Sequence, residues 1–313
     1  MIVSSRVPRS TPSTPLLDYL ARRFTYLSAD TWRERIDEGR ILCNGSACTS
    51  ASTVGGGDIL SYDMPEFAEP PADMAYEIVY EDTWLLGINK PGNLLVHRSG
   101  RSFTSNLMYD IRHVHRPPHP EAHAVNRLDR ETSGVVLAAR DRQTLRRMHG
   151  LFSARAVEKE YLAVVHGIPK PPAGTIDLPI GRAAGSRVSY RFSANGESAR
   201  EACTVYETRE RLGGRYAVMV LRPRTGRTHQ LRVHMAAIGH PIAGDKLYGM
   251  PEQDFLHWRA AGGLPPGWPC ARQALHCRMI SFWHPAKNER VSIEAPVPEA
   301  MRVFIRNAAS HTI

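Results

Sequence analysis

Short segments with a helical spacing of apolar residues alternate along the chain with runs that have the character of β-strands. Residues 14–24 (TPLLDYLARRF) place leucine and phenylalanine at helical intervals, which predicts an amphipathic helix. Residues 28–39 predict a second helix, in which Ser28 is the N-cap and Gly39 the terminator. The amino-terminal region is therefore expected to contain a helix pair.

A strand, a turn and a strand are predicted directly after this helix pair. In RILCNGSACTS, the pair Asn44-Gly45 is a strong short signal for a β-hairpin. VGGGDIL then turns into one more strand, which completes a compact module over residues 14–64. Residues 1–13 are expected to form a flexible tail, and the proline- and acid-rich residues 65–75 are expected to form a linker.

Residues 76–313 form a second predicted domain, in which helical and β-rich segments are interspersed. The helical segments include RQTLRRMHGLFSA and THQLRVHMAAIGH, and the β-rich runs include GVVLAAR and KEYLAVVHG. No glycine-rich nucleotide-binding loop follows a strand, so a doubly wound fold is not expected. The pattern predicts an α+β fold with a large mixed, mostly antiparallel sheet flanked by helices. Residues 250–269, rich in proline and glycine, are expected to be an inserted surface loop.

The formal charge of +9 adds to this picture because it is unevenly distributed. Residues 1–64 contain seven arginines, no lysine and seven acidic residues, so the excess of positive charge lies in residues 65–313. A basic domain of this kind favours a polyanionic partner, most often nucleic acid. Only five of the 40 basic residues are lysines. Arginine suits phosphate contact and base stacking, but a GC-rich genome would produce the same bias.

Several kinds of site and compartment are not expected. The five cysteines are scattered and form neither a disulfide framework nor a CxxC metal motif. His229, His234 and His240 do not share one helix face, so a zinc site is not predicted. No apolar run approaches the roughly 18 residues of a membrane span, and the first residues lack the apolar core of a secretion signal. We therefore expect a reduced, cytoplasmic protein.

One carboxylate stands between two cations in the stretch NRLDRETSG. Asp129 lies between Arg127 and Arg130, directly before a tight turn and an apolar strand. The simplest interpretation is a surface salt bridge, since exposed pairs of this kind are common and weak. The other interpretation is a catalytic carboxylate at the edge of a buried sheet, which the neighbouring arginines keep ionised.

Two further clusters carry candidate side chains. Tyr161 begins the apolar strand KEYLAVVHG, where it either packs in the core or stacks on a base. In TGRTHQLRVHMAAIGH, Thr228 is expected to cap a helix whose apolar stripe includes Leu231. Arg227 then lies at a helix start, where the helix dipole disfavours a cation. A specific anionic partner is therefore expected for Arg227, and Asp129 is one candidate.

Together the three clusters resemble the RluA-like family of pseudouridine synthases. The first motif of the family reads His-Arg-Leu-Asp-Arg followed by a Thr-Ser-Gly turn, and NRLDRETSG matches it with Asn126 in the histidine position. KEYLAVVHG matches the second motif, and TGRTHQLRVHMAAIGHPIAGDKLYG matches the third almost throughout. IVYEDTWLLGINKPGNLLVH and RQALHCRMISFWHP resemble the flanking segments, so the resemblance extends over most of residues 76–305.

The resemblance implies an isomerase that converts specific uridines of structured RNA, ribosomal or transfer, to pseudouridine without a cofactor or metal. Asp129 would be the catalytic carboxylate, either as a nucleophile at the anomeric carbon or in removing a proton from the ribose. Tyr161 would stack on the base and help to move the proton from its carbon five. Arg227 would form an ion pair with Asp129.

The resemblance also implies contacts to the substrate RNA. Leu231 would pack on the uracil, and Arg127 would fill the gap that the flipped uridine leaves in the RNA stack. Arg130 would be a phosphate or surface contact. The asparagine at position 126 leaves Asp129 intact, so it puts local RNA contacts in doubt more than the chemistry.

Residues 14–64 resemble the alpha-L RNA-binding module of a small-subunit ribosomal protein and of tyrosyl-tRNA synthetases, through DEGRILCNG and GGGDIL. Arginines on its helix pair would form a phosphate-facing surface: Arg22, Arg23, Arg33, Arg35 and Arg40. The alternative is that these arginines lie on solvated helix faces, balanced by the seven acidic residues of this region.

Two other classes of protein are weighed against the synthase. A catalytically silent RNA-binding protein of the same fold would be favoured by loss of Asp129, Tyr161 or Arg227, and all three are present. A glycosidase-like hydrolase needs a second paired acid, for which Glu131 is the nearest candidate. We expect a monomeric enzyme that binds RNA, with no membrane or nucleotide partner. The target RNA is not predicted, because recognition depends on RNA shape.

Overall fold

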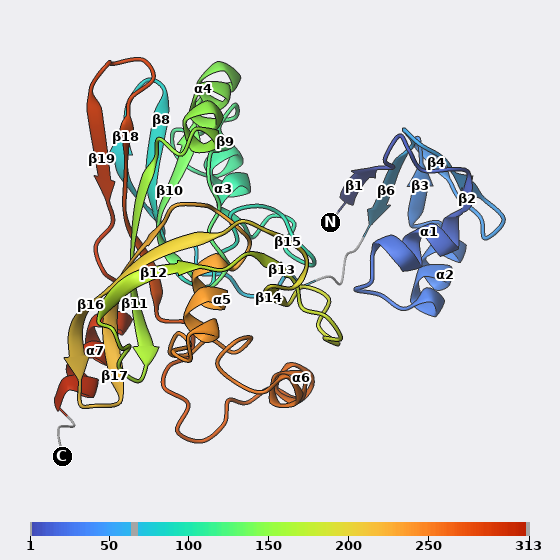
Figure 1. Ribbon diagram of the computed structural model, residues 1–313. Coiled ribbons are helices and arrows are strands. Elements are labelled where there is room, and N and C mark those ends of the chain that lie inside the picture. Colours follow the sequence, from blue (N-terminus) through green and yellow to red (C-terminus); the bar gives the residue numbers. More distant parts are fainter. Residues whose placement is uncertain (1, 64–67, 311–313) are drawn as a thin grey trace. The chain divides into compact units, whose positions relative to one another are not determined.

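The computed structural model describes residues 2–63 and 68–310, and the chain divides into two compact units. Unit 1 combines the residues up to Pro71 with the segment Arg98–Asn106, and unit 2 comprises the rest (Figure 1). The division falls inside the predicted linker, of which residues 65–67 lie outside the described part. That residues 98–106 belong to unit 1 was not predicted, because no local pattern in them indicates a long-range contact.

Unit 1 contains the predicted helix pair and hairpin. Its helices are α1 (Leu16–Arg23) and α2 (Ala29–Asp37). The Ser28 side chain accepts a hydrogen bond from Thr31 N at 3.1 Å, which confirms the N-cap. The hairpin turns through Asn44 and Gly45, which both have positive φ. The strands form a sheet in the order β1-β6-β3-β4 and a separate pair: β1 (Ile2–Arg6), β3 (Ile41–Cys43), β4 (Ser46–Ala47), β6 (Ile59–Asp63), β2 (Thr14–Pro15) and β5 (Thr53–Val54).

The expected tail is part of this sheet. Strand β1 pairs antiparallel with β6 over its whole length, and Val7 is buried in the core of unit 1. The prediction of a flexible tail over residues 1–13 was therefore wrong for the described residues. A five-residue strand with no regular alternation has little local signal, and the edge of β6 that it covers is distant in sequence.

The segment Arg98–Asn106 completes the core of unit 1. The Phe103 side chain is buried among aromatic residues of the helix pair, with its ring centroid 6.1 Å from that of Tyr26 in an edge-on arrangement. The Glu69 carboxylate accepts hydrogen bonds from the backbone N–H groups of Phe103, Thr104 and Ser105 at 2.8–3.0 Å. These contacts hold the segment against the remainder of unit 1.

Unit 2 is built on one ten-stranded sheet with the main order β12-β16-β17-β11-β18-β10-β8-β7. Strand β19 pairs with β18, and β9 pairs with β10. The strands are β7 (Glu77–Glu81), β8 (Leu85–Lys90), β9 (His123–Ala124), β10 (Ser133–Ala139), β11 (Glu158–His166), β12 (Ala173–Asp177), β16 (Cys203–Leu212), β17 (Tyr216–Pro223), β18 (Leu275–Trp283) and β19 (Arg290–Glu294).

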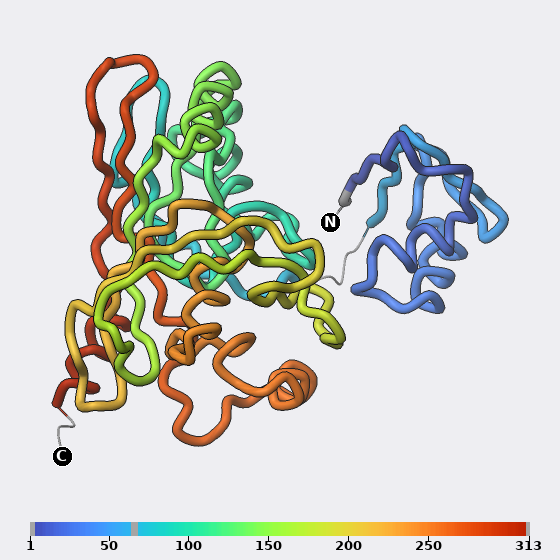
Figure 2. The backbone as a smooth tube through the Cα atoms, viewed as in Figure 1, coloured from blue at the N-terminus to red at the C-terminus, as the bar shows by residue number. Residues whose placement is uncertain are grey.

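This sheet confirms the predicted α+β class. Strands β10 and β18 run parallel where Ser133 and Gly134 face His276 and Cys277, and the other described pairs of the sheet are antiparallel. Figure 2 shows the green β10 and the orange-red β18 side by side, although more than a hundred residues separate them in sequence.

Helices cover both faces of the sheet, because alternate residues of a strand point to opposite sides. On β11, Ala163 and Val165 pack with residues of α5 (Gln230–Ala237). The intervening Leu162 and Val164 pack with residues of α7 (Glu299–Ser310). The other end of the sheet carries α3 (Leu107–His113) and α4 (Arg142–Ser153) beside β8 and β10 (Figure 1).

The inserted region is more ordered than its composition indicated. Residues 250–269, predicted as a loop, contain helix α6 (Glu252–Ala261), whose Phe255 is buried with Leu247 and Met250. The Glu252 carboxylate accepts a hydrogen bond from Arg187 N at 2.9 Å and another from the Ser186 hydroxyl. A small sheet in the order β14-β13-β15 precedes this region in sequence: β13 (Ile180–Arg182), β14 (Phe192–Ala194) and β15 (Glu197–Arg200).

Candidate active site

Asp129 lies in the tight loop that leads into β10. The loop turns through a hydrogen bond from Thr132 N to the Asp129 carbonyl at 3.1 Å. Gly134 follows with φ +110°, and a Cβ at this position would overlap the backbone of Cys277. The Thr-Ser-Gly turn therefore needs glycine, because β10 and β18 approach each other closely here. The result is a carboxylate held at the end of a buried strand.

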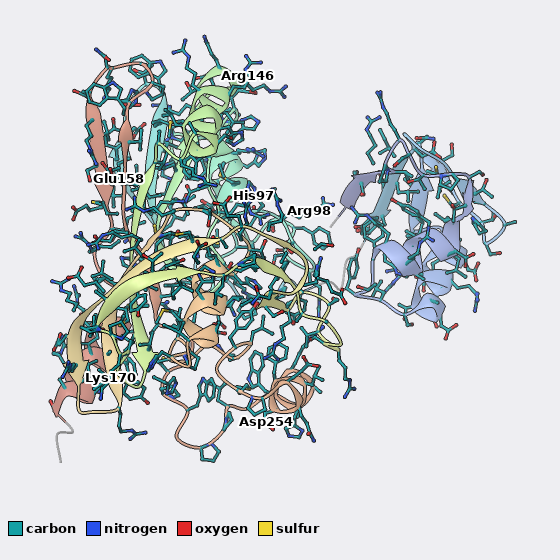
Figure 3. The ribbon with its side chains drawn as sticks, in the orientation of Figure 1. His97, Arg98, Arg146, Glu158, Lys170 and Asp254 are labelled. Atoms are coloured by element: carbon teal, nitrogen blue, oxygen red, sulfur yellow. The ribbon has the colours of Figure 1, made fainter. Side chains whose placement is uncertain are left out.

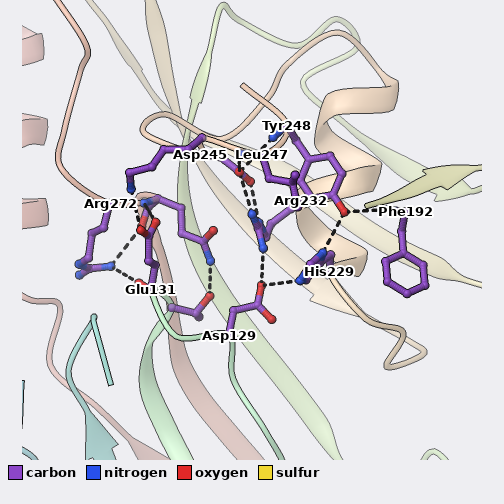
Figure 4. A network of polar contacts seen from close by, with 12 residues as sticks. Asp129, Glu131, Phe192, His229, Arg232, Asp245, Leu247, Tyr248 and Arg272 are labelled. Carbon is purple, nitrogen blue, oxygen red and sulfur yellow. Dashed lines mark hydrogen bonds and ion pairs between the residues drawn. The ribbon is translucent and has the colours of Figure 1, made fainter. Parts of the chain in front are cut away.

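The Asp129 carboxylate forms an ion pair with an arginine that sequence reasoning did not select. Arg232 Nη1 donates to Asp129 Oδ2 at 2.8 Å (Figure 4). The same guanidinium donates through Nε and Nη2 to both oxygens of Asp245, at 2.7 and 2.8 Å. Asp245 is fully buried and also accepts hydrogen bonds from the backbone N–H groups of Leu247 and Tyr248. Arg232 therefore bridges an anchored carboxylate and a partly exposed one.

This arrangement keeps Asp129 ionised. Burial raises the pKa of Asp129, but the positive charge of Arg232, the neighbouring His229 and hydrogen bonds from Arg232 and Gln273 together outweigh burial. The net pKa of Asp129 lies below the ordinary value for an aspartate. The side chain keeps 31% of its exposure, so the ionised carboxylate stays accessible.

The predicted ion pair between Arg227 and Asp129 was wrong. Arg227 Nε donates instead to the Glu201 carbonyl at 2.9 Å, in the chain that leads into β16. Arg232 lies in the first turn of α5, so the signal used for Arg227, a cation near a helix start, applies equally to Arg232. Two carboxylates offset the unfavourable dipole at Arg232, but the sequence does not indicate which of the two arginines faces them.

The predicted cap of α5 was also wrong. The N-cap is His229 in place of Thr228, and the His229 side chain makes no capping hydrogen bond. Gln230 contributes the local bonds instead: its Oε1 accepts from Arg227 N at 3.0 Å and from the Thr225 hydroxyl at 2.7 Å. The buried Leu231 confirms the predicted apolar stripe of the helix.

Tyr161 lies on β11, half-buried between two apolar clusters of unit 2. Tyr161 faces Cys277 of the neighbouring strand β18 in the register of the sheet. Burial raises the pKa of Tyr161 well above its ordinary value, and the charges of Cys277 and Asp129 act in the same direction. Tyr161 is therefore a neutral phenol within the electrostatic reach of Asp129. Leu231 packs in the same apolar cluster as the Tyr161 ring.

The loop around Asp129 is held from several sides by side chains that sequence reasoning missed. Lys90 Nζ is fully buried and donates to the Leu94 carbonyl at 2.9 Å and to the Arg130 carbonyl at 3.3 Å. Glu131 accepts from Lys246 Nζ at 2.6 Å, so the acid considered for a hydrolase is engaged in an ion pair. Lys246 and Asp245 both belong to the stretch GDKLYG. The adjacent opposite charges in this stretch were the only sequence feature that could have indicated these two residues.

The residues beside Asp129 differ in their contacts. Arg127 is exposed and makes no hydrogen bond or ion pair with the described residues. Arg130 Nε donates to Asn93 Oδ1 at 2.9 Å. Asn126 Oδ1 accepts from Leu137 N at 2.7 Å, and its Nδ2 donates to the Val135 carbonyl at 3.4 Å. The asparagine in the histidine position therefore pins the loop to β10.

Known proteins share this sequence and fold. Residues 85–237 match the family model described as RNA pseudouridylate synthase. Ribosomal large subunit pseudouridine synthase D of Xylella fastidiosa is 36% identical over 296 residues, covering 90% of this chain and 84% of that protein. The protein of the same name from Xanthomonas campestris pv. campestris is 34% identical, covering 95% of this chain and 89% of that protein.

The chain belongs to the RluA-like family of RNA pseudouridine synthases. A solved structure of Human RNA Pseudouridylate Synthase Domain Containing 1 is 26% identical with a TM-score of 0.58, covering 73% of this chain and 86% of that one. The predicted family, fold class and isomerase activity are thereby confirmed. The synthase acts on RNA.

The five arginines predicted to contact RNA from unit 1 of the synthase have different partners. Arg22 and Arg23 are exposed in the last turn of α1 and make no ion pair with the described residues. Arg33 pairs with Asp30 at 3.2 Å, and Arg35 and Arg40 both pair with Glu38, at 3.2 and 2.9 Å. The balanced-charge interpretation therefore describes these three arginines, and α1 presents two unpaired cations.

The described part of the synthase contains neither a candidate membrane span nor a candidate metal site. No helix of residues 2–63 and 68–310 is long and apolar enough to cross a membrane. In the same part of the chain, no group of three or more His, Cys, Asp or Glu side chains is placed to hold a metal ion.

Proposed function

We propose that the synthase isomerises a uridine of large-subunit ribosomal RNA, with Asp129 as its catalytic carboxylate. The names of the two relatives that cover most of the chain support this target. The observation that carries the catalytic assignment is the pair of Asp129 with Arg232, which Asp245 holds in turn. An ionised, accessible carboxylate on a braced loop is the group that this isomerisation needs.

The isomerisation replaces one bond between ribose and base by another and transfers one proton. The bond from the ribose C1′ to N1 of the uracil breaks, the base turns, and a bond from C1′ to C5 forms. The proton on C5 leaves and N1 gains one, so no oxidant or reductant takes part. A carboxylate can attack C1′ or remove a proton from the ribose, and both routes require Asp129 to be ionised. The low pKa of Asp129 meets this requirement at neutral pH.

Tyr161 and Arg127 receive separate tasks in this proposal. The phenol of Tyr161, which its raised pKa keeps neutral, stacks on the base and relays the C5 proton. The exposed Arg127 side chain enters the RNA stack after the uridine is flipped out, since the glycosidic bond is otherwise unreachable. Arg227, without an ion pair to Asp129, is assigned to RNA phosphate contact together with Arg130.

Basic side chains of α4 supply another RNA contact in this proposal. A hollow of about 310 Å³ is lined by His123, Arg142, Leu145 and Arg146. Arg142 and Arg146 lie one turn apart on α4, are exposed, and make no ion pair with the described residues (Figure 3 labels Arg146). Like charges at this spacing repel each other, and a polyanion removes the repulsion.

Unit 1 is assigned to RNA binding as an alpha-L type module, with Arg22 and Arg23 as its phosphate contacts. Its helix pair and hairpin follow the predicted order, and the two arginines are unpaired. A monomeric enzyme that works in the cytoplasm without a cofactor stays a prediction of the sequence.

Substitution of Asp129 by Asn tests the catalytic assignment. We expect Asp129→Asn to abolish pseudouridine formation while RNA binding persists, because the amide can neither attack C1′ nor accept a proton. Asp141→Asn is the matched control: Asp141 caps α4 at the other end of β10, and asparagine caps a helix equally well. Turnover by Asp129→Asn, or its loss in Asp141→Asn, would overturn the assignment.

The target is tested by comparing pseudouridine maps of total RNA from cells with and without the gene. We expect one or more positions of large-subunit ribosomal RNA to lose the modification, and the gene for wild-type protein, but not for Asp129→Asn, to restore it. Loss confined to transfer RNA would contradict the proposed target and leave the activity intact.

A further inference from the structure

A histidine that has no assigned task lies beside the proposed catalytic carboxylate. His229 Nε2 is 4.0 Å from Asp129 Oδ2, the oxygen that also accepts from Arg232. On the other side of the ring, His229 Nδ1 is 2.9 Å from the Tyr248 hydroxyl. Figure 4 shows both donors on one oxygen of Asp129, while the other oxygen points away from them.

The hydrogen bonds around Tyr248 are compatible with a His229 tautomer that carries its proton on Nε2. The backbone N–H of Phe192 donates to the Tyr248 hydroxyl oxygen at 3.1 Å. The hydroxyl proton is then free to point at His229 Nδ1, which lies 2.9 Å away and accepts it in this tautomer. The Nε2 proton of the neutral imidazole then faces the Asp129 carboxylate.

His229 stays neutral at physiological pH. Burial lowers its pKa to about 4, and the adjacent Arg232 guanidinium acts in the same direction against the opposing charges of Asp129 and Asp245. A neutral imidazole donates to Asp129 without adding a second full charge. The basicity of the carboxylate is then set mainly by Arg232.

The backbone of His229 has an unfavourable conformation. His229 adopts φ 55° and ψ 18°, in the left-handed region that few residues other than glycine occupy, although asparagine, aspartate and histidine do so more often than the rest. Its side chain makes no capping hydrogen bond that would compensate for this conformation. Strain at such a position is commonly retained where it places a functional side chain.

We propose that His229 is a positioning residue for Asp129, with Tyr248 as the group that fixes its Nε2–H tautomer. The Nε2–H and Arg232 hold Oδ2 between them, so that Oδ1 faces the ribose. The gap of 4.0 Å closes when substrate binds, as is common for hydrogen bonds in unliganded active sites. This proposal rests on the proposed catalytic function of Asp129.

Substitution of His229 by Asn separates this task from a structural one. Asparagine tolerates the left-handed conformation, but its shorter side chain cannot reach Asp129 from the same backbone position. We expect His229→Asn to lower kcat by about 10- to 100-fold, the range seen when a partner that orients a reactive group is removed. The Kd for RNA should not rise, and the unfolding temperature should not fall. Wild-type kcat, or a loss of activity that follows a loss of folded protein, would overturn the proposal.

Substitution of Tyr248 by Phe tests the tautomer. It keeps the ring beneath Arg232 and removes only the hydroxyl. Nitrogen-15 spectra should show the His229 proton on Nε2 in the wild type and a mixture of both tautomers in Tyr248→Phe. The kcat should fall several-fold, and the double variant with His229→Asn should be no slower than His229→Asn alone, because Tyr248 acts through His229. Tyr80→Phe removes a comparable hydroxyl on β7 and should leave kcat unchanged.

The outcomes separate this proposal from the proposed function. If Asp129→Asn is inactive and His229→Asn is fully active, Asp129 keeps its function and the positioning proposal fails. If Asp129→Asn is active, the catalytic assignment itself fails. A spectrum with the His229 proton on Nδ1 in the wild type would overturn the tautomer, and with it the proposed donor to Asp129.

Discussion

The geometry of the site depends on Arg232 more than on any other single residue, because two carboxylates, Asp129 and Asp245, bind its guanidinium. A lysine would keep the charge, but a single ammonium cannot reproduce the paired contact with Asp245 and the contact with Asp129 together. The position is therefore specific for arginine in geometry as well as in charge.

The pH dependence of turnover should report this sharing. The positive charge of Arg232 lowers the pKa of Asp129, so activity is present above that pKa and is lost as pH falls through it. We expect Arg232→Lys to raise the pKa of Asp129 and to move the acid limb of the kcat profile to higher pH. The profile of kcat against pH under single-turnover conditions measures this shift.

Arg222→Lys provides the comparison, since Arg222 also bridges two carboxylates, Glu160 and Glu207, but its side chain is 42% exposed. The acid limb of the kcat profile of Arg222→Lys should coincide with that of the wild type. An unchanged limb in Arg232→Lys as well would show that Arg232 does not set the ionisation of Asp129.

The sequence predicted the residues of the site that belong to family motifs, and it failed where a partner is distant in the chain. Asp129 and Tyr161 stand at motif positions, and the structure brings both into unit 2 beside β18. Arg227 was selected for its unfavourable position at a helix start, and Arg232, which lies in the first turn of the same helix, was not considered. Asp245 and His229 were not chosen, because their partners are set by the path of the chain between β17 and α6.

Elements defined by local rules were predicted well. The Ser28 cap, the Asn44-Gly45 turn and the apolar runs of β10 and β11 each follow from a few adjacent residues. Strand β1 and the segment 98–106 gain their structure from contacts far along the chain, and no local pattern indicates these contacts. Helix α6 was missed because glycine and proline around it outweighed its short helical pattern.

The segment 98–106 should be a structural part of unit 1. We expect Phe103→Ala to destabilise unit 1 by about 3–5 kcal/mol, because the substitution leaves a cavity among aromatic side chains. Native-state hydrogen exchange measures this for each unit separately: amides of α1 and α2 should exchange faster, while those of β10 and β11 should not change.

Ser99→Ala, an exposed change in the same segment, should leave exchange in both units at the wild-type rate. Unchanged exchange of α1 and α2 in Phe103→Ala would show that unit 1 does not depend on the segment.

The molecule as a whole has its charge excess in the residues after 64, and yet unit 1 presents two unpaired arginines. The fold class and the basic character of unit 2 were readable from the sequence, because both sum over many residues. Whether unit 1 contributes to RNA affinity depends on the few arginines that form no ion pair with an acidic residue. The sequence does not identify these arginines, because ion pairs are visible only in the structure.

Salt titration of RNA binding tests unit 1. Each phosphate contact adds about 0.7–0.9 to the slope of log K against log salt, depending on whether the RNA is single- or double-stranded. We expect Arg22→Gln with Arg23→Gln to reduce this slope by up to about 1.8 and to leave kcat at saturating RNA unchanged. Arg33→Gln, which removes a cation already paired with Asp30, should change the slope much less. Equal slopes for all three proteins would assign RNA binding to unit 2 alone.

The two-piece composition of unit 1 has a consequence for how such proteins diversify. A gene segment that encodes only the residues up to 71 lacks Phe103 and the backbone donors that bind Glu69. If recombination transferred this segment to another synthase, its core would contain a cavity at the place where Phe103 packs. We therefore expect a functional chimera to require the loop between β8 and α3 to be exchanged together with the amino-terminal piece.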